Sequence, residues 1–169
     1  MTMGRKGITL IELIVVIGII SILLAVATIN FNNWTRRHNI EKEVKELYSD
    51  LMFIRQQALV TGMNHRANFE TANSVVFRRY SSEADPDGRV VRRRNVNYPI
   101  TISDPTEREI EFNTRGMMDT VIAKSICIFT TANPANPPLD SIYITQTRIN
   151  VGKIINQGNT CGKDNITLK

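Results

Sequence analysis

The feature that most constrains this chain is an apolar run near its N-terminus that contains a single carboxylate. Residues 8–31, ITLIELIVVIGIISILLAVATINF, hold one charged side chain, that of Glu12. As an α-helix with a rise of ~1.5 Å per residue, residues 8–29 would extend about 33 Å, which matches a hydrocarbon core of about 30 Å. An ionisable side chain inside such a span costs about 3 kcal/mol, so Glu12 is expected to have a partner.

Two interpretations of this segment predict different mature proteins. The preceding residues, MTMGRKG, are short, polar and positive, so the rest of the chain should lie across the membrane from the cytoplasm. One interpretation is a secretory signal peptide, in which the small residues Ala25 and Ala27 form an A-x-A cleavage site and the mature chain begins at Thr28. That interpretation leaves Glu12 unexplained.

The second interpretation rests on a family resemblance. The stretch GITLIELIVVIGIISILLAVA resembles the N-termini of type IV pilins and type II secretion pseudopilins over residues 4–30, with Ile8 where phenylalanine is usual. The resemblance implies that a prepilin peptidase cleaves between Gly7 and Ile8 and N-methylates Ile8. It also implies that Glu12 pairs with the new N-terminal amine of its own or an adjacent subunit, which makes Glu12 an assembly residue.

The apolar span is followed by an amphipathic pattern over residues 34–61. Lys42 with Glu46 and Glu41 with Lys45 form opposite-charge pairs at a spacing of four, on the side expected to face solvent. Residues with steps of four and three mark the apolar face: Ile40, Val44, Leu47, Leu51, Ile54 and Ala58. We expect this helix to end near Gly62 and to pack on the domain's own sheet.

Beyond the helix, the pattern changes to short runs rich in β-branched and aromatic residues, separated by turn residues such as Gly116. They predict seven or eight mainly antiparallel strands. The predicted fold is therefore α+β, with a long N-terminal helix, transmembrane and then amphipathic, packed on a β domain, and the resemblance implies that this arrangement is pilin-like. The expected divisions are a leader peptide at 1–7, a transmembrane helix at 8–30, its amphipathic continuation at 31–62 and a periplasmic domain at 63–169, in an inner-membrane protein that crosses once.

The chain has two cysteines, Cys127 and Cys161, which are too few and too far apart for a zinc site. In an oxidising compartment a disulfide between them is expected, and two buried reduced thiols are the alternative.

A second, looser resemblance covers residues 40–155. IEFNTRG at 110–116 and TRINVGK at 147–153 are similar to segments of H-type pseudopilins and FimT-type minor pilins. This implies a structural subunit that joins or primes a type IV pilus or a type II secretion pseudopilus, and the sequence does not distinguish the two. The implied partners are other pilin subunits through the N-terminal helix, the prepilin peptidase and the inner membrane.

No constellation in the sequence indicates an enzyme. The chain lacks a G-x-S-x-G elbow, a phosphate-binding glycine loop and an H-E-x-x-H motif, and no cofactor or metal site is predicted. The two histidines, His38 and His65, are expected to be surface or boundary residues.

The alternative function is DNA binding. The formal net charge of +5 falls to +3 without Arg5 and Lys6, so the mature domain is mildly basic. The candidate phosphate-binding residues are Arg78, Arg79, Arg92, Arg94 and Arg148. By resemblance, DNA-binding FimT-type pilins carry a glycine-arginine-x-arginine motif where this chain has TRIN at 147–150, so one arginine is kept. Strand alternation places Arg93 on the opposite face, and a solvated basic hairpin is the simpler interpretation.

Overall fold

The chain is described by a computed structural model that covers residues 8–82, 85–129, 136–158 and 160–169. It forms two compact units, residues 1–36 and residues 37–169. The predicted leader at 1–7, with its cleavage residue Gly7, lies outside the described residues.

One helix, α1, runs over Leu10–Thr61 and ends where Gly62 adopts a φ of 62°, with its N–H donating to the Ala58 carbonyl at 3.0 Å. The prediction of a single long helix ending at this glycine is confirmed, because glycine takes the left-handed conformation without the clash that a Cβ brings. Within the described part of the chain, no helix meets the length and hydropathy required of a membrane span.

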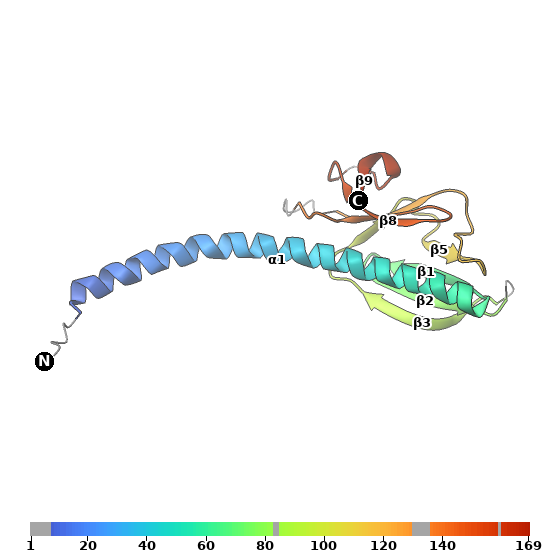
Figure 1. Cartoon of the computed structure of the whole chain (residues 1–169), viewed down its shortest axis with the longest axis horizontal. Coiled ribbons are helices and arrows are strands. Elements are labelled where there is room, and N and C mark those ends of the chain that lie inside the picture. The colour runs from blue at the N-terminus through green and yellow to red at the C-terminus, as the bar shows by residue number, and fades with distance from the viewer. Residues whose placement is uncertain (1–7, 83–84, 130–135, 159) are drawn as a thin grey trace, which may run out of the picture. The chain divides into compact units, whose positions relative to one another are not determined.

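The second unit contains two antiparallel sheets (Figure 1). The first has the order β3-β2-β1-β5 and the second the order β4-β6-β7-β8-β9. The strands are β1 Asn64–Thr71, β2 Ser74–Tyr80, β3 Arg89–Asn95, β4 Ile100–Ile102, β5 Glu109–Phe112, β6 Lys124–Ile128, β7 Ser141–Ile144, β8 Ile149–Ile154 and β9 Ile166–Leu168, with a 3-10 helix η1 at Lys163–Asn165. The prediction of seven or eight strands is met by β1–β8, and β9 is an additional short strand that the pattern did not predict.

The apolar face of α1 forms the centre of this unit. Its six predicted residues are at most 2% exposed, and they share one cluster with buried residues of both sheets, including Phe77, Phe112, Ile126 and Ile142. Each sheet therefore covers part of the helix stripe, and removal of this apolar surface from water is the main stabilising contribution. The predicted pairs on the outer side of α1 also form, with Nζ–Oε1 distances of 2.6 Å for Lys45–Glu41 and 3.9 Å for Lys42–Glu46.

A buried lysine connects the two sheets. Lys124 of β6 is 3% exposed, and its ammonium donates to the backbone carbonyl of Glu109 in β5 at 2.8 Å and lies 2.9 Å from the Glu107 carboxylate. A buried ammonium needs such partners because burial without them disfavours its charge. The contact fixes one edge of the first sheet against the second.

Candidate functional helix start and basic hairpin

The N-terminus of α1 is closed by reciprocal hydrogen bonds between Thr9 and Glu12. The Thr9 backbone N–H and hydroxyl donate to Glu12 Oε2 at 2.8 and 2.9 Å, and the Glu12 N–H donates to the Thr9 hydroxyl at 3.3 Å. This is a capping box, in which each side chain satisfies an N–H group that the first helical turn leaves unpaired. Glu12 thus has a local partner, which the T-x-x-E spacing could have predicted and which the sequence interpretation missed.

The helix that follows this cap presents apolar side chains to solvent on every side. The large hydrophobic residues from Leu10 to Leu24 are each 48–77% exposed. Gly18 has open space around it, and the Ser21 hydroxyl donates to the Ile17 carbonyl at 2.8 Å, so its polar group is satisfied within the helix. A helix that is apolar all round requires a cover of lipid or of other helices.

The basic hairpin of β2 and β3 divides its arginines between two faces. On the face toward α1, Arg92 and Arg94 both bind the carboxylate of Asp50, which is 1% exposed. Arg94 also binds Glu46, with Nη1–Oε2 2.7 Å apart, and the Arg92 guanidinium lies 5.2 Å from the centre of the Phe53 ring. These two arginines therefore fasten the edge strand β3 to α1.

The opposite face carries the pair formed by Arg78 and Arg93. Both guanidinium groups contact Glu70 of β1, with N–O distances of 3.4 and 3.0 Å. The expected separation of Arg93 from Arg92 and Arg94 is confirmed. Each face of the hairpin therefore neutralises part of its own charge.

A third position contains Arg79 and Arg89, which lie directly opposite each other in β2 and β3, with His65 opposite Arg79 in β1. Among the described residues, neither arginine forms an ion pair. His65 is 1% exposed, so its expected place at the surface or boundary is wrong: β1 carries it inward, where its Nδ1 lies 2.9 Å from the Met63 carbonyl oxygen. Burial, and to a lesser extent the charge of Arg79, lowers the pKa of His65.

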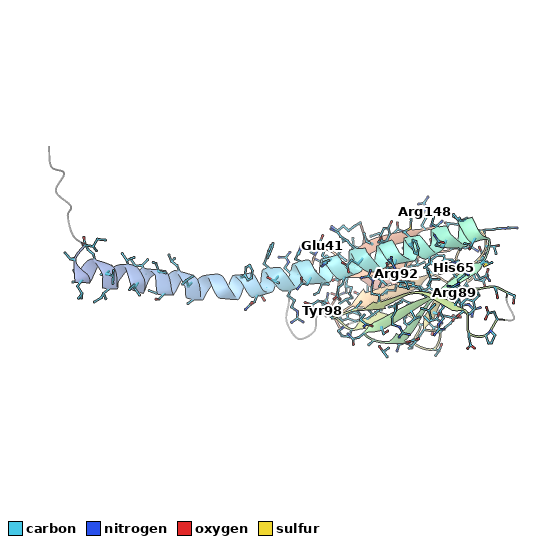
Figure 2. The ribbon with its side chains drawn as sticks, turned by 90° about the horizontal axis from the view of Figure 1, so that it is seen from below. Glu41, His65, Arg89, Arg92, Tyr98 and Arg148 are labelled. Carbon is cyan, nitrogen blue, oxygen red and sulfur yellow. A yellow bond between two sulfur atoms is a disulfide. The ribbon has the colours of Figure 1, made fainter. Side chains whose placement is uncertain are left out.

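Arg148 lies apart from the others, because it immediately precedes β8 in the second sheet. Figure 2 shows Arg148 and Arg89 on opposite sides of α1. The Arg148 backbone N–H donates to the Thr145 hydroxyl at 3.1 Å, and this hydrogen bond closes the turn between β7 and β8. The five candidate arginines therefore occupy four places on the domain rather than one patch.

Three carboxylates of α1 that bind other parts of the domain were not predicted from the sequence. Glu43 accepts hydrogen bonds from the Asn97 backbone and side chain at 2.8 and 2.7 Å, while Glu46 and Asp50 bind the arginines of β3. Their spacing of three and four places them in one line beside the apolar stripe. That line, together with a strand rich in arginine, was the signal available in the sequence.

Comparison with known proteins supplies the deciding observation. Residues 2–28 match the family model described as the prokaryotic N-terminal methylation motif. The chain thus carries this motif at its N-terminus and is similar there to type IV pilins. No curated protein matches the sequence of this pilin-like chain.

The fold is also similar to that of solved structures. Two crystal structures of the type IV minor pilin FimU from Pseudomonas aeruginosa, in space groups P21 and P65, match with TM-scores of 0.58 and 0.54 and 12% identity. They cover 76% and 72% of this chain and 99% of the FimU chain in each case. At this identity the match establishes a shared fold, a long helix packed on antiparallel sheets. The capping box of the pilin-like chain lies within the residues that match the methylation motif.

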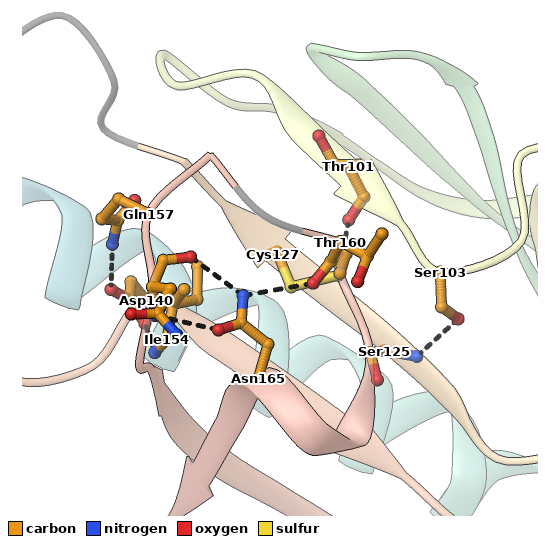
Figure 3. Close-up of a disulfide and its surroundings, with 11 residues drawn as sticks. Thr101, Ser103, Ser125, Cys127, Asp140, Ile154, Gln157, Thr160 and Asn165 are labelled. Carbon is orange, nitrogen blue, oxygen red and sulfur yellow. Dashed lines mark hydrogen bonds between the residues drawn. A yellow bond between two sulfur atoms is a disulfide. The ribbon is translucent and has the colours of Figure 1, made fainter.

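The pilin-like chain has a second, smaller core near its C-terminus (Figure 3). The expected disulfide joins Cys127 of β6 to Cys161, and both cysteines pack with Ile154 and Ile166. In the same region Asp140, fully buried, accepts hydrogen bonds from the Ile154 N–H at 2.6 Å and from Gln157 Nε2 at 3.0 Å. Burial raises the Asp140 pKa to about 6, against the opposing effect of these hydrogen bonds.

Metal binding has no support in the described residues. Within the described ranges, no three His, Cys, Asp or Glu side chains are placed to hold an ion. Asp85 accepts hydrogen bonds from the Ser81 hydroxyl at 2.9 Å and the Gly88 N–H at 3.0 Å, so its carboxylate closes the turn at residues 85–88.

Proposed function

We propose that this chain is a minor pilin or pseudopilin, a structural subunit that joins or primes a type IV pilus or a type II secretion pseudopilus. The observation that carries the proposal is an apolar helix, exposed all round, that starts at the Thr9–Glu12 capping box within the matched methylation motif. In this account a prepilin peptidase cleaves between Gly7 and Ile8 and N-methylates Ile8. The role is assembly rather than catalysis.

In this proposal the exposed apolar helix is buried first by lipid and then, after assembly, by the helices of other subunits. Before assembly, residues 8–30 lie in the inner membrane as a single span, and in the filament the same surface packs against the helices of other subunits. Lipid and neighbouring helices are both apolar, so the transfer between them changes little hydrophobic free energy. Electrostatic contacts then determine the register of one helix against another.

Glu12 provides that contact. Cleavage before Ile8 creates a positive amine four residues from the carboxylate, and an adjacent subunit presents an equivalent amine. In a low-dielectric bundle such a pair is favourable when both charges are present and costly when one is missing. Thr9 holds the Glu12 side chain at the start of the helix through the hydrogen bonds at 2.8 and 2.9 Å. The cap therefore orients the carboxylate before a second subunit arrives.

The unit formed by residues 37–169 is proposed to face the periplasm. A disulfide between Cys127 and Cys161 is stable in an oxidising compartment and rare in the cytoplasm. Among minor subunits we favour the group of H-type pseudopilins and FimT-type pilins, and the fold shared with the type IV minor pilin FimU supports this choice.

The proposal is tested by incorporation into filaments in a host with its own prepilin peptidase and pilus machinery. Glu12→Gln keeps the side-chain shape and removes the charge, whereas Thr9→Ala removes the cap hydroxyl and keeps the charge. We expect both variants to be processed, Glu12→Gln to be absent from sheared filaments, and Thr9→Ala to be incorporated at a reduced level. Normal incorporation of Glu12→Gln would contradict the assigned role of the carboxylate.

DNA binding is a second proposal, and the observation that favours it is limited to arginines that form no ion pair with another described residue. Among the described residues, Arg79, Arg89 and Arg148 form no ion pair, whereas Arg92 and Arg94 bind Asp50 and are needed by the fold. The informative variants are therefore Arg79→Gln and Arg148→Gln. A salt-dependent shift in the electrophoretic mobility of duplex DNA, smaller with either variant than with the native protein, would support DNA binding. The absence of a shift at low salt would remove it.

A further inference from the structure

We propose that Trp34 and Phe31 form an interfacial anchor, which binds the lipid headgroup region at the periplasmic surface of the membrane. This inference rests on the proposed single-pass insertion of the helix and adds the depth at which the span ends. The partner is a bilayer surface, recognised by the apolar Phe31 ring and by the Trp34 indole, which is apolar over most of its area and polar at its N–H.

The first observation is the exposure of both rings. Phe31 is 64% and Trp34 62% exposed, and their ring centroids lie 6.1 Å apart. They are one helical turn apart, so they lie on the same side of α1. Asn32 and Asn33, also exposed, place amide groups beside them. Tryptophan with neighbouring polar groups is typical of the membrane–water interface, where the ring is buried and its N–H remains hydrated.

The second observation is the distance between the two polar limits of the apolar segment. Glu12 and Trp34 lie in the same helix, and the 22 residue steps between them span about 33 Å at a rise of ~1.5 Å. This length matches a hydrocarbon core of about 30 Å. When Trp34 lies at one interface, Glu12 lies at the other, where its carboxylate avoids the bilayer centre. The position of Glu12 at the interface, together with its pairing, therefore explains how an apolar run can contain a carboxylate.

The third observation is the uniform apolar character of the described helix surface from Leu13 to Leu24. The described large hydrophobic residues from Leu13 to Leu24 are each 48–68% exposed, so no polar face turns the helix toward a surface-parallel orientation. The depth of the helix in the bilayer is therefore set by the residues at its two ends. The anchor acts at the end nearer the folded domain.

The test uses the one tryptophan of the chain as its probe. The full-length protein is reconstituted into vesicles of phosphatidylethanolamine and phosphatidylglycerol, with brominated lipids that carry bromine either near the headgroup or near the bilayer centre. We expect Trp34 emission to shift to shorter wavelength on reconstitution and to be quenched more strongly by the shallow bromines. The matched control combines Trp34→Phe with Leu23→Trp, which places the probe midway between Glu12 and Trp34, and the deep bromines should quench it more strongly.

The outcomes separate the anchor from the span on which it rests. Deep quenching at position 23 with no quenching of Trp34 would overturn the anchor and leave the membrane span intact. The same result would follow if a neighbouring subunit, rather than lipid, were the partner. Stronger quenching of Trp34 by deep bromines would also overturn the assigned depth. If neither probe were quenched, the proposed insertion would fail, and the anchor with it.

Discussion

Asp50 on α1 and Arg94 on β3 form an ion pair in which the carboxylate is 1% exposed and the guanidinium 21%. Arg92 binds the other carboxylate oxygen, so one buried anion holds two cations of an edge strand. An edge strand exposes unpaired backbone groups, and charged side chains that attach it to a helix keep it in place. The hairpin that looked like a DNA-binding surface in the sequence is thus partly a structural clasp.

Replacement of Asp50 should destabilise the domain. Asp50→Asn leaves two arginines without their shared anion, and because both reach solvent we expect a loss of about 2–4 kcal/mol in the free energy of unfolding. Denaturant titration of the full-length protein in detergent measures this value. The matched control is Glu41→Gln, which removes an exposed pair on the same helix and should cost about 0.5 kcal/mol or less. Equal losses in the free energy of unfolding for the two variants would show that the Asp50 contacts stabilise the domain no more than an exposed ion pair does.

The buried carboxyl of Asp140 should make stability depend on pH. Its pKa rises from 3.8 to about 6 on folding, so the folded state favours the neutral form. Its contribution to the free energy of unfolding is therefore fully present below 3.8 and is lost as the pH rises to about 6, by a total of about 3 kcal/mol.

Asp140→Asn should remove this dependence. The amide oxygen can still accept from the Ile154 N–H, and the Gln157 amide can turn its oxygen toward the new NH₂ group. We expect the variant to gain stability relative to the native chain above about pH 6, by on the order of 1–3 kcal/mol, and to gain little below the ordinary pKa. A constant difference between the two proteins at all pH values would contradict the assignment.

Loss of the disulfide should unfold the C-terminal region first. The bond closes a loop with a sequence separation of 34, for which the loop-entropy relation gives about 4 kcal/mol. Its cluster is separate from the main core, so the double variant Cys127→Ala with Cys161→Ala should lose hydrogen-exchange protection over residues 160–169. The amides of α1 around Leu51 should stay protected. Uniform loss of protection across the domain would show that the two cores unfold together.

The turn at Gly116 should reject a side chain. Gly116 has a φ of 65°, and a Cβ there would lie 2.7 Å from Leu59 Cγ, so Gly116→Ala combines backbone strain with a clash. Because the exposed Leu59 side chain can move, we expect a cost of about 2 kcal/mol, mostly from the backbone. Gly162→Ala is the control, since an added Cβ there meets nothing within 4 Å, and its effect should be within about 0.5 kcal/mol. Thermal unfolding that shifts equally for both would contradict this reasoning.

The sequence predicted those parts of the fold that depend on local patterns. The stripe from Ile40 to Ala58 follows the helical period, and the helix stop at Gly62 and the turn at Gly116 need a residue without Cβ, so each could be assigned from nearby residues. β9 was missed because a three-residue strand, Ile166–Leu168, has no period of its own and is held by pairing with β8.

The side-chain partners were harder to predict because they depend on long-range pairing. Arg92 and Asp50 are 42 residues apart, and whether an arginine faces DNA or an internal carboxylate depends on which face of β3 meets α1. His65 was misplaced for the same reason, since alternation in β1 decides its face only once the position of the helix is known. The Thr9–Glu12 cap, by contrast, was local and could have been predicted.

In the proposed processing, the mature protein begins at Ile8 and keeps the N-terminal helix. Intact mass of the protein purified from a host with its own prepilin peptidase, with fragmentation of the N-terminal peptide, tests this most directly. We expect a chain that starts at Ile8 and carries one added methyl group. A chain that starts at Thr28 would mean that the helix was only a signal peptide, and it would contradict the proposed assembly role.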